Sequence, residues 1–190
     1  PYGGSANALT ITGGKAVLNG GTVGRLTVSS GAEAELNGAT INGPINSSGT
    51  LTTTDGVVNG PLSSVGTLTL NGGTFTNASG VAVTVNGGTA TIQRGTINGL
   101  TYGVEAIDGT TTIEKLAVVR GGTKALYGNG GSLTVNNGKF TNPSELIAGT
   151  VTFNAGFFQS ATGPTAFEKQ VWRNTAGPEF REGYEFFVGD

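Results

Sequence analysis

The sequence predicts an all-β protein, a right-handed parallel β-helix of about eight coils with a C-terminal cap. Three observations support this fold class. A short unit recurs along the chain, apolar residues alternate with period two inside each unit, and Gly or Asn occupies the bend that follows. Gly supplies 35 of the 190 residues without a G-X-Y period, so a collagen-like triple helix is excluded.

The repeated unit is clearest after Thr67 and Ser132, where Leu-Thr-Leu-Asn-Gly-Gly-Thr-Phe-Thr-Asn corresponds to Leu-Thr-Val-Asn-Asn-Gly-Lys-Phe-Thr-Asn. The position before the second apolar segment marks eight copies, at Gly21, Ala39, Gly56, Gly73, Gly95, Leu116, Gly138 and Gly156. Successive markers are 18, 17, 17, 22, 21, 22 and 18 residues apart. This period fits a coil of three short strands and excludes helical repeats of about 33 residues or more.

Three sets of apolar residues are expected to form the inner walls of the coils. The first set alternates within one strand, as Leu68 and Leu70 do. After the bend, one apolar residue opens the next strand and gives the column Val23, Ile41, Val58, Phe75, Ile97, Val118, Phe140 and Phe158. The third set contains Leu9, Ile11, Leu26, Val28, Ile45, Leu62, Val81, Val83 and Val85. Stacked about 4.8 Å apart, these columns would form one continuous core.

An antiparallel sandwich with short strands and Gly-rich turns is the alternative fold. A sandwich places its strands in differing environments, whereas this chain repeats one motif in eight near-copies. The repeat therefore favours the solenoid.

The last part of the chain breaks the repeat, so we divide the chain into a β-helix over residues 1–160 and a C-terminal cap, or the start of a following module, over residues 161–190. The run Thr165-Ala-Phe-Glu168 fits a capping box, and Phe167 and Val171 would share one face of a short helix that ends near Arg173. A solenoid must cover its last apolar layer and its open strand edges, which favours a cap. A carbohydrate platform that uses Trp172 is the alternative.

The composition excludes several kinds of catalytic site. Without His or Cys, the chain cannot form a Ser-His-Asp or Cys-His group, and it lacks the usual zinc ligands. Asp55 and Asp108, with a few Glu, are too few for a Ca²⁺ site in the coils. Glu33 and Glu35 would lie about 6.7 Å apart on one strand, a separation that a glycosidase could use, but such a pair is more simply a solvated face. We predict no catalytic residue, no metal and no cofactor.

The charge and the hydropathy of the chain argue against nucleic acid and membrane as partners. The formal net charge is −2 and the ten Lys and Arg are scattered, so no basic surface for nucleic acid is expected. No apolar run approaches the roughly 20 residues that span a bilayer, so we expect no membrane insertion. The chain begins at Pro1 and has no Met, which suggests a segment of a longer chain. The absence of Cys forbids disulfides and suits an exposed bacterial surface protein, but it does not by itself assign a compartment.

A row of T-x-T pairs is the main candidate binding surface. The pairs fall at the outward positions that flank the inward residues of the first strand, in six consecutive units. Neighbouring hydroxyls would lie about 6.7 Å apart along a strand and about 4.8 Å apart between coils. The candidate residues are Thr50, Thr52, Thr67, Thr69, Thr89, Thr91, Thr110, Thr112, Thr134, Thr150 and Thr152, with Ser132 completing one pair. The simplest explanation of the row is that Thr favours exposed strand positions and that stacked Thr pairs stabilise parallel strands.

The units from Gly66 to Asn77 and from Leu133 to Asn142 resemble the Gly/Thr/Asn-rich repeats of pectin-lyase-like β-helix proteins on bacterial surfaces, including adhesins and autotransporter passengers. The resemblance covers roughly residues 7–160. It implies a non-enzymatic structural or adhesive segment in an extracellular or cell-surface location. Such a segment would bind a glycan or a host surface protein through flat faces rich in Thr and Asn.

Two alternative functions follow from related resemblances. Polysaccharide lyases and polygalacturonases share the β-helix fold, so a relative of a polysaccharide-active enzyme is one alternative. Their Asp clusters and catalytic Arg or Lys have no match in this chain, and no catalytic residue is carried over. The T-x-T row also resembles the faces of ice-binding β-solenoids, which makes ice binding the other alternative.

Overall fold

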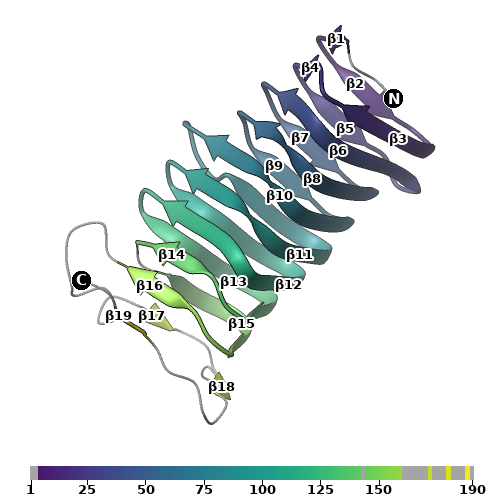
Figure 1. Cartoon of the computed structure of the whole chain (residues 1–190). Helices are drawn as coiled ribbons and strands as arrows, with labels where there is room; N and C mark the ends of the chain where they lie inside the picture. Colours follow the sequence, from purple (N-terminus) through teal and green to yellow (C-terminus); the bar gives the residue numbers. More distant parts are fainter. Residues whose placement is uncertain (1–3, 143, 160–170, 173–178, 181–186, 189–190) are drawn as a thin grey trace.

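The computed structural model describes residues 4–142 and 144–159 and three short strands in the C-terminal tail. In this part of the chain the backbone winds into a parallel β-solenoid of about eight turns, whose coils stack along one axis (Figure 1). Every pairing between the described strands is parallel. The predicted fold class is therefore confirmed, and the antiparallel sandwich is excluded.

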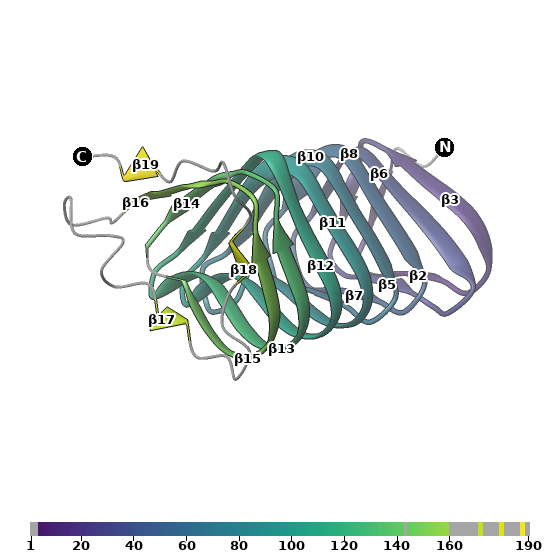
Figure 2. The same cartoon turned by 90° about the horizontal axis from the view of Figure 1, so that it is seen from below.

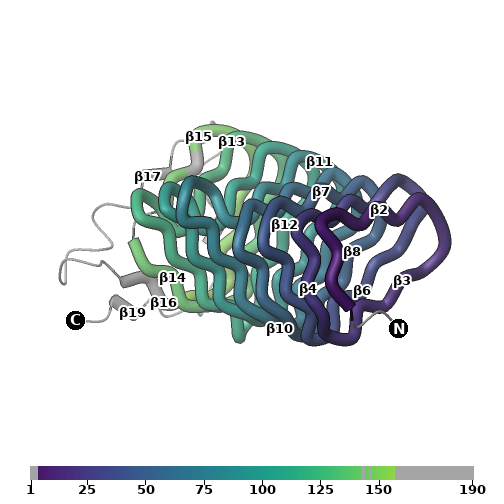
Figure 3. Tube along the Cα trace, turned by 90° about the horizontal axis from the view of Figure 1, so that it is seen from above, coloured from purple at the N-terminus to yellow at the C-terminus, as the bar shows by residue number. Residues whose placement is uncertain are grey.

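Each coil has three walls, which can be followed around the Cα trace in Figure 3. The first wall carries the T-x-T positions, the second wall follows the next bend, and the third wall closes the coil. The strands that contribute to the first wall, several of which bend into a neighbouring wall, are β3 (Gly14–Asn19), β6 (Ala32–Ile41), β8 (Thr50–Val58), β10 (Thr67–Asn77), β11 (Val83–Gly99), β12 (Tyr102–Gly121), β13 (Lys124–Val135) and β15 (Glu145–Phe153).

The remaining strands of the coils belong to a single wall. Four strands lie only in the second wall: β1 (Ser5–Ala6), β4 (Thr22–Val23), β14 (Lys139–Thr141) and β16 (Phe157–Gln159). Four others lie only in the third wall: β2 (Leu9–Ile11), β5 (Leu26–Val28), β7 (Ile45–Ser47) and β9 (Leu62–Ser64).

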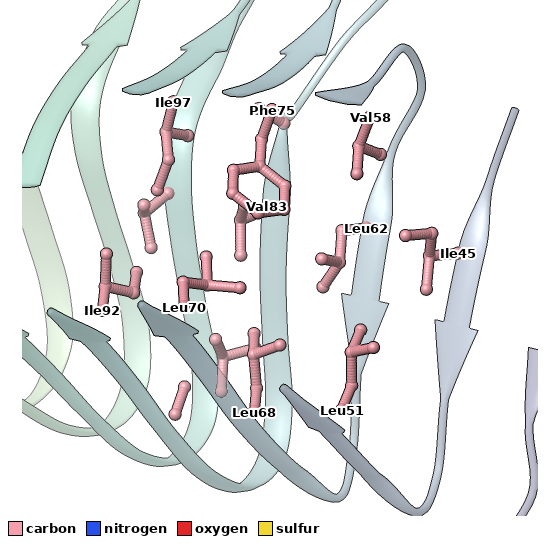
Figure 4. Close-up of a cluster of buried hydrophobic side chains, with 14 of the residues drawn as sticks. Ile45, Leu51, Val58, Leu62, Leu68, Leu70, Phe75, Val83, Ile92 and Ile97 are labelled. Carbon is pink, nitrogen blue, oxygen red and sulfur yellow. The ribbon is translucent and has the colours of Figure 1, made fainter. Parts of the chain in front are cut away.

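The interior is a continuous stack of buried apolar side chains, part of which Figure 4 shows. Phe75 is 1% exposed and pairs in register with Val58 and Ile97 of the neighbouring coils. Leu68 and Leu70 are 1% and 0% exposed, as the alternating pattern predicts. Burying one such side chain contributes about 1.5–3 kcal/mol, so the stacked columns are the main source of stability.

The predicted inner column of the second wall is wrong in one coil. Val119 fills the position that the sequence assigned to Val118: it is 0% exposed and pairs with Ile97 and Phe140. Val118 instead is half-buried at an outward position beside Thr96. The alignment is therefore one residue out of register after the bend of this coil.

A β-bulge causes this shift. On β11 only Gln93 lies between two paired positions, whereas on β12 both Glu114 and Lys115 lie there. The extra residue turns the predicted marker Leu116 outward, where it is 61% exposed, and Ala117 takes the place opposite Gly95. In the third wall, Val81 is likewise not on the wall but half-buried in the turn before β11.

Most of the variation in coil length lies at the corner between the second and third walls. The turn runs from Val58 to Leu62 in a short coil and from Phe75 to Val83 in a long one. Asn77 is 6% exposed and braces the longer turn, because its Nδ2 donates to the carbonyl of Val81 at 2.7 Å. The added residues therefore project at one corner and leave the first wall unchanged.

Three short strands continue the ladders beyond β16. They are β17 (Val171–Trp172) and β18 (Glu179–Phe180), which pair with β15, and β19 (Phe187–Val188), which pairs with β16. The helix expected to end near Arg173 is therefore wrong at residues 171–172, since a β-branched and an aromatic residue there pair with the edge of β15. The rest of that predicted helix, residues 165–170 and 173, lies outside the described residues. No helix in the described part of the chain has the length and apolarity needed to cross a membrane.

Candidate functional site: a threonine array on the first wall

Two columns of hydroxyl side chains lie on the outer face of the first wall, and we call them together the threonine array. Figure 2 shows the strands of this wall running side by side. Each member pairs in register with its counterpart on the next coil. The first column contains Thr50, Thr67, Thr89, Thr110, Ser132 and Thr150, and the second contains Thr52, Thr69, Thr91, Thr112, Thr134 and Thr152.

The array is regular because every register shift falls outside it. Between β10 and β11 the shifts begin after Leu70, and between β11 and β12 they occur before Thr89 and after Ile92. The spacings of about 6.7 Å along a strand and about 4.8 Å between coils therefore persist over six coils, a length of about 24 Å. Differences in coil length do not interrupt the surface.

The two columns differ in exposure. Thr67, Thr89, Thr110 and Thr150 in the first column are exposed, whereas every member of the second column is half-buried. Inward neighbours such as Leu68 are buried and fix which face of each strand points to solvent. The hydroxyls are thus held on a rigid backbone before any ligand arrives.

Charged side chains mark the N-terminal border of the array. Glu33 and Glu35 pair with Thr50 and Thr52, so they occupy the same two columns one coil earlier. Glu33 is exposed, and Glu35 Oε2 lies 3.0 Å from Lys15 Nζ. This hydrogen bond to Glu35, together with the carboxylate charge, raises the pKa of Lys15. These exposures and this ion pair suit a solvated, charged border.

The remaining acidic residues singled out in the sequence support bends. Asp55 Oδ1 accepts the N–H of Gly56 at 2.8 Å, and Asp108 Oδ1 accepts the N–H of Gly109 at 2.7 Å. Nowhere among the residues that the structure describes do three His, Cys, Asp or Glu side chains gather into a potential metal site.

A shallow groove lies beside the array, at the β-bulge. It is lined by Gln93, Arg94, Glu114, Lys115 and Leu116. Glu114 Oε1 accepts a hydrogen bond from Asn136 Nδ2 at 2.9 Å, and Arg94 Nε donates to the carbonyl of Asn71. Two of the four polar side chains that line the groove, Arg94 and Glu114, thus bond to neighbouring coils.

Sequence reasoning missed a second polar group of residues, on the third wall. The rings of Tyr102 and Tyr127 stack with their centroids 4.6 Å apart and an interplanar angle of 24°. Lys124 Nζ lies 5.6 and 5.1 Å from the two centroids and forms an ion pair with Glu145. We call these four residues, with Glu105 beside them, the tyrosine cluster. Its members come from three coils, so only the register between coils could have identified it.

No protein-family model, curated protein or solved structure matches the chain. The parallel solenoid and its repeat therefore rest on the geometry of this chain alone.

Proposed function

We propose that this chain is a non-enzymatic structural and adhesive segment of a bacterial surface or secreted protein, and that the threonine array is its glycan-binding face. The observation that carries the proposal is the unbroken register of the array across six coils.

The chemistry of the array suits a neutral polysaccharide. Each Thr offers a hydroxyl that both donates and accepts hydrogen bonds, next to a methyl group, and a sugar presents hydroxyls next to C–H groups. The array itself contains no charged residue between Thr50 and Thr152. Rigid strands reduce the entropy lost when a ligand binds.

Repetition compensates for the weakness of each contact. A single Thr pair offers little binding energy, but an extended glycan can contact several coils at once, and linked contacts raise the overall affinity. The same geometry would serve a structural stalk, because a long solenoid displays its binding face along its whole length. A host surface protein remains the alternative partner within this proposal.

A glycan array probed with the intact chain and with a Thr69→Tyr/Thr91→Tyr variant tests the proposal. The two bulky rings would interrupt the second column on two adjacent coils near the centre of the array, and a glycan that spans both columns should no longer bind. The matched control is Thr74→Tyr/Thr96→Tyr, which places the same rings on the same two strands at half-buried, outward positions of the second wall. The control should bind like the parent.

Two results would contradict the proposal. Equal binding by both double variants would remove the array as the binding face. Cleavage of an acidic polysaccharide by the purified chain would instead support the enzymatic alternative.

Ice binding is the second candidate, and the regular, uncharged two-dimensional spacing of the hydroxyls favours it. Thermal hysteresis and inhibition of ice recrystallisation, measured on the parent and on the same two double variants, separate the candidates. Activity lost only in Thr69→Tyr/Thr91→Tyr would establish ice binding, whereas an inactive parent would eliminate it.

A further inference from the structure

We propose that the tyrosine cluster on the third wall is a binding subsite for one neutral pyranose ring. The subsite lies on a different wall from the threonine array, and the inference does not depend on that array binding anything.

Register between coils assembles the subsite. Thr84, Glu105, Tyr127 and Glu145 occupy one outward column of the third wall, each in register with the next. Tyr127 therefore has a carboxylate on each side, at a spacing of about 4.8 Å. Tyr102 lies in the neighbouring column, opposite Lys124.

The aromatic pair is held in place by its neighbours. The ion pair to Glu145 anchors the Lys124 ammonium, whose side chain is only 22% exposed. The distances from Nζ to the two ring centroids are nearly equal, 5.6 and 5.1 Å, so the ammonium lies beside the stacked pair and not over its outer faces. Each half-buried ring thus keeps an outer face that neither the other ring nor the ammonium covers.

The groups present complement both sides of a pyranose. The C–H face of the sugar is apolar and packs on an aromatic ring, while its hydroxyls need acceptors at the edge of that ring. Glu105 is such an acceptor: its Oε2 takes a hydrogen bond from Thr84 Oγ1 at 3.3 Å, and a carboxylate can accept several more. A preorganised aromatic platform also costs little conformational entropy on binding.

Charge selects a neutral sugar. Lys124 contributes one positive charge, and Glu105 and Glu145 contribute two negative charges, so the cluster carries a net charge of −1. This charge repels a uronic or sialic acid. A cationic ligand on either ring would be repelled by the like charge of the Lys124 ammonium, which lies 5.6 and 5.1 Å from the two ring centroids.

Saturation-transfer NMR with methyl glucopyranoside and with glucuronic acid tests the inference, because the two probes differ chiefly in charge. We expect transfer to the ring protons of the glucoside and none to the acid. Tyr127→Leu should weaken glucoside binding at least about tenfold, or about 1.4 kcal/mol. Tyr127→Phe retains the ring and should bind like the parent, and so should Thr74→Tyr/Thr96→Tyr, which changes only outward positions of the second wall.

A second measurement covers the case in which Tyr127→Leu does not fold. Tyrosine-selective carbon-13 labelling of the parent gives ring signals from the four tyrosines of the chain, and the glucoside should shift those of Tyr102 and Tyr127. Undisturbed signals from these two rings would overturn the proposal. So would a folded Tyr127→Leu variant with parental affinity, or equal binding of glucoside and glucuronic acid.

Discussion

Alanine substitution at Val118 and at Val119 provides a sharp test of the register derived from the structure. The two residues are adjacent and identical, so the intrinsic cost of replacing Val by Ala in a strand is the same in both variants. They differ in environment, because Val119 is 0% exposed between Ile97 and Phe140, whereas Val118 is half-buried on the outer face. Any large difference between the two variants therefore measures packing.

The expected magnitudes follow from burial. Val119→Ala removes two buried carbons, worth about 1.6 kcal/mol at about 0.8 kcal/mol each. The cavity left between stacked coils adds up to about 1 kcal/mol, so the total loss is about 1.6–2.6 kcal/mol. Val118→Ala removes the same groups from a partly solvated site and should cost about 0.5–1 kcal/mol.

Urea unfolding followed by far-UV circular dichroism measures both losses. With a slope of about 2 kcal/mol per M, Val119→Ala should lower the midpoint by about 0.8–1.3 M and Val118→Ala by about 0.5 M or less. Val58→Ala and Val57→Ala calibrate the comparison, since these adjacent residues are 1% and 39% exposed. A larger loss for Val118→Ala than for Val119→Ala would refute the bulge and restore the register expected from the sequence.

Three further experiments, two that compare a pair of substitutions and one deletion, test other parts of the fold. Phe75→Asp places an unpaired charge in the core and should prevent folding. Asp55→Asn keeps an acceptor for the N–H of Gly56 and should lower the free energy of unfolding by less than about 1 kcal/mol. The reverse order in chemical denaturation would show that the inner column is misassigned. Gly109→Ala should cost more than about 1 kcal/mol in the same assay, because φ is +79° and a Cβ would lie 2.4 Å from the carbonyl oxygen of Gly88. Gly13→Ala should be nearly neutral, because nothing lies within 4 Å of its Cβ. Equal losses in the two variants would argue against the close contact between coils at Gly109. Removal of residues 161–190 should leave the edges of β15 and β16 without the pairings to β17, β18 and β19, so the product should self-associate. Light scattering after size-exclusion chromatography would detect this association. A monomeric product of unchanged stability would assign the tail to a separate module.

The sequence was sufficient to predict the solenoid and the threonine array, because the same residues define both. A T-x-T pair alternates with inward residues, as Thr67 and Thr69 do around Leu68. The motif alone therefore indicates that the segment is a strand and which of its residues point outward. Stacking equivalent motifs then places the hydroxyls in columns without any knowledge of the turns. This explains why coil lengths of 17 to 22 residues did not spoil the prediction.

Where a position depends on local backbone detail, the sequence was not sufficient. The pair Val118 and Val119 offers two equivalent apolar candidates, and only the bulge at Glu114 and Lys115 decides between them. The sequence also does not indicate which polar residues point inward. Thr53 is 1% exposed, and its Oγ1 donates to the carbonyl of Gly72 at 3.0 Å, which satisfies the buried hydroxyl. This partner lies in the next coil, and no local pattern indicates it.

The tyrosine cluster shows the same limit at longer range. Tyr102 and Tyr127 stack across a diagonal between two coils, because Tyr102 pairs with Lys124 and Tyr127 pairs with Glu105. Contacts of this kind depend on which residues of neighbouring coils lie in register, and the pattern of residues within one strand does not reveal that.

The longer turns at one corner also bear on how such a chain can change over evolution. Residues added between Phe75 and Val83 project at the corner between the second and third walls, and the pairing of Thr67 with Thr89 on the first wall is unaffected. Insertions and deletions at this corner can therefore accumulate without altering the face opposite to them. A repeat protein built in this way can diversify one edge while it conserves another, and a protein engineer could graft foreign loops at the same corner.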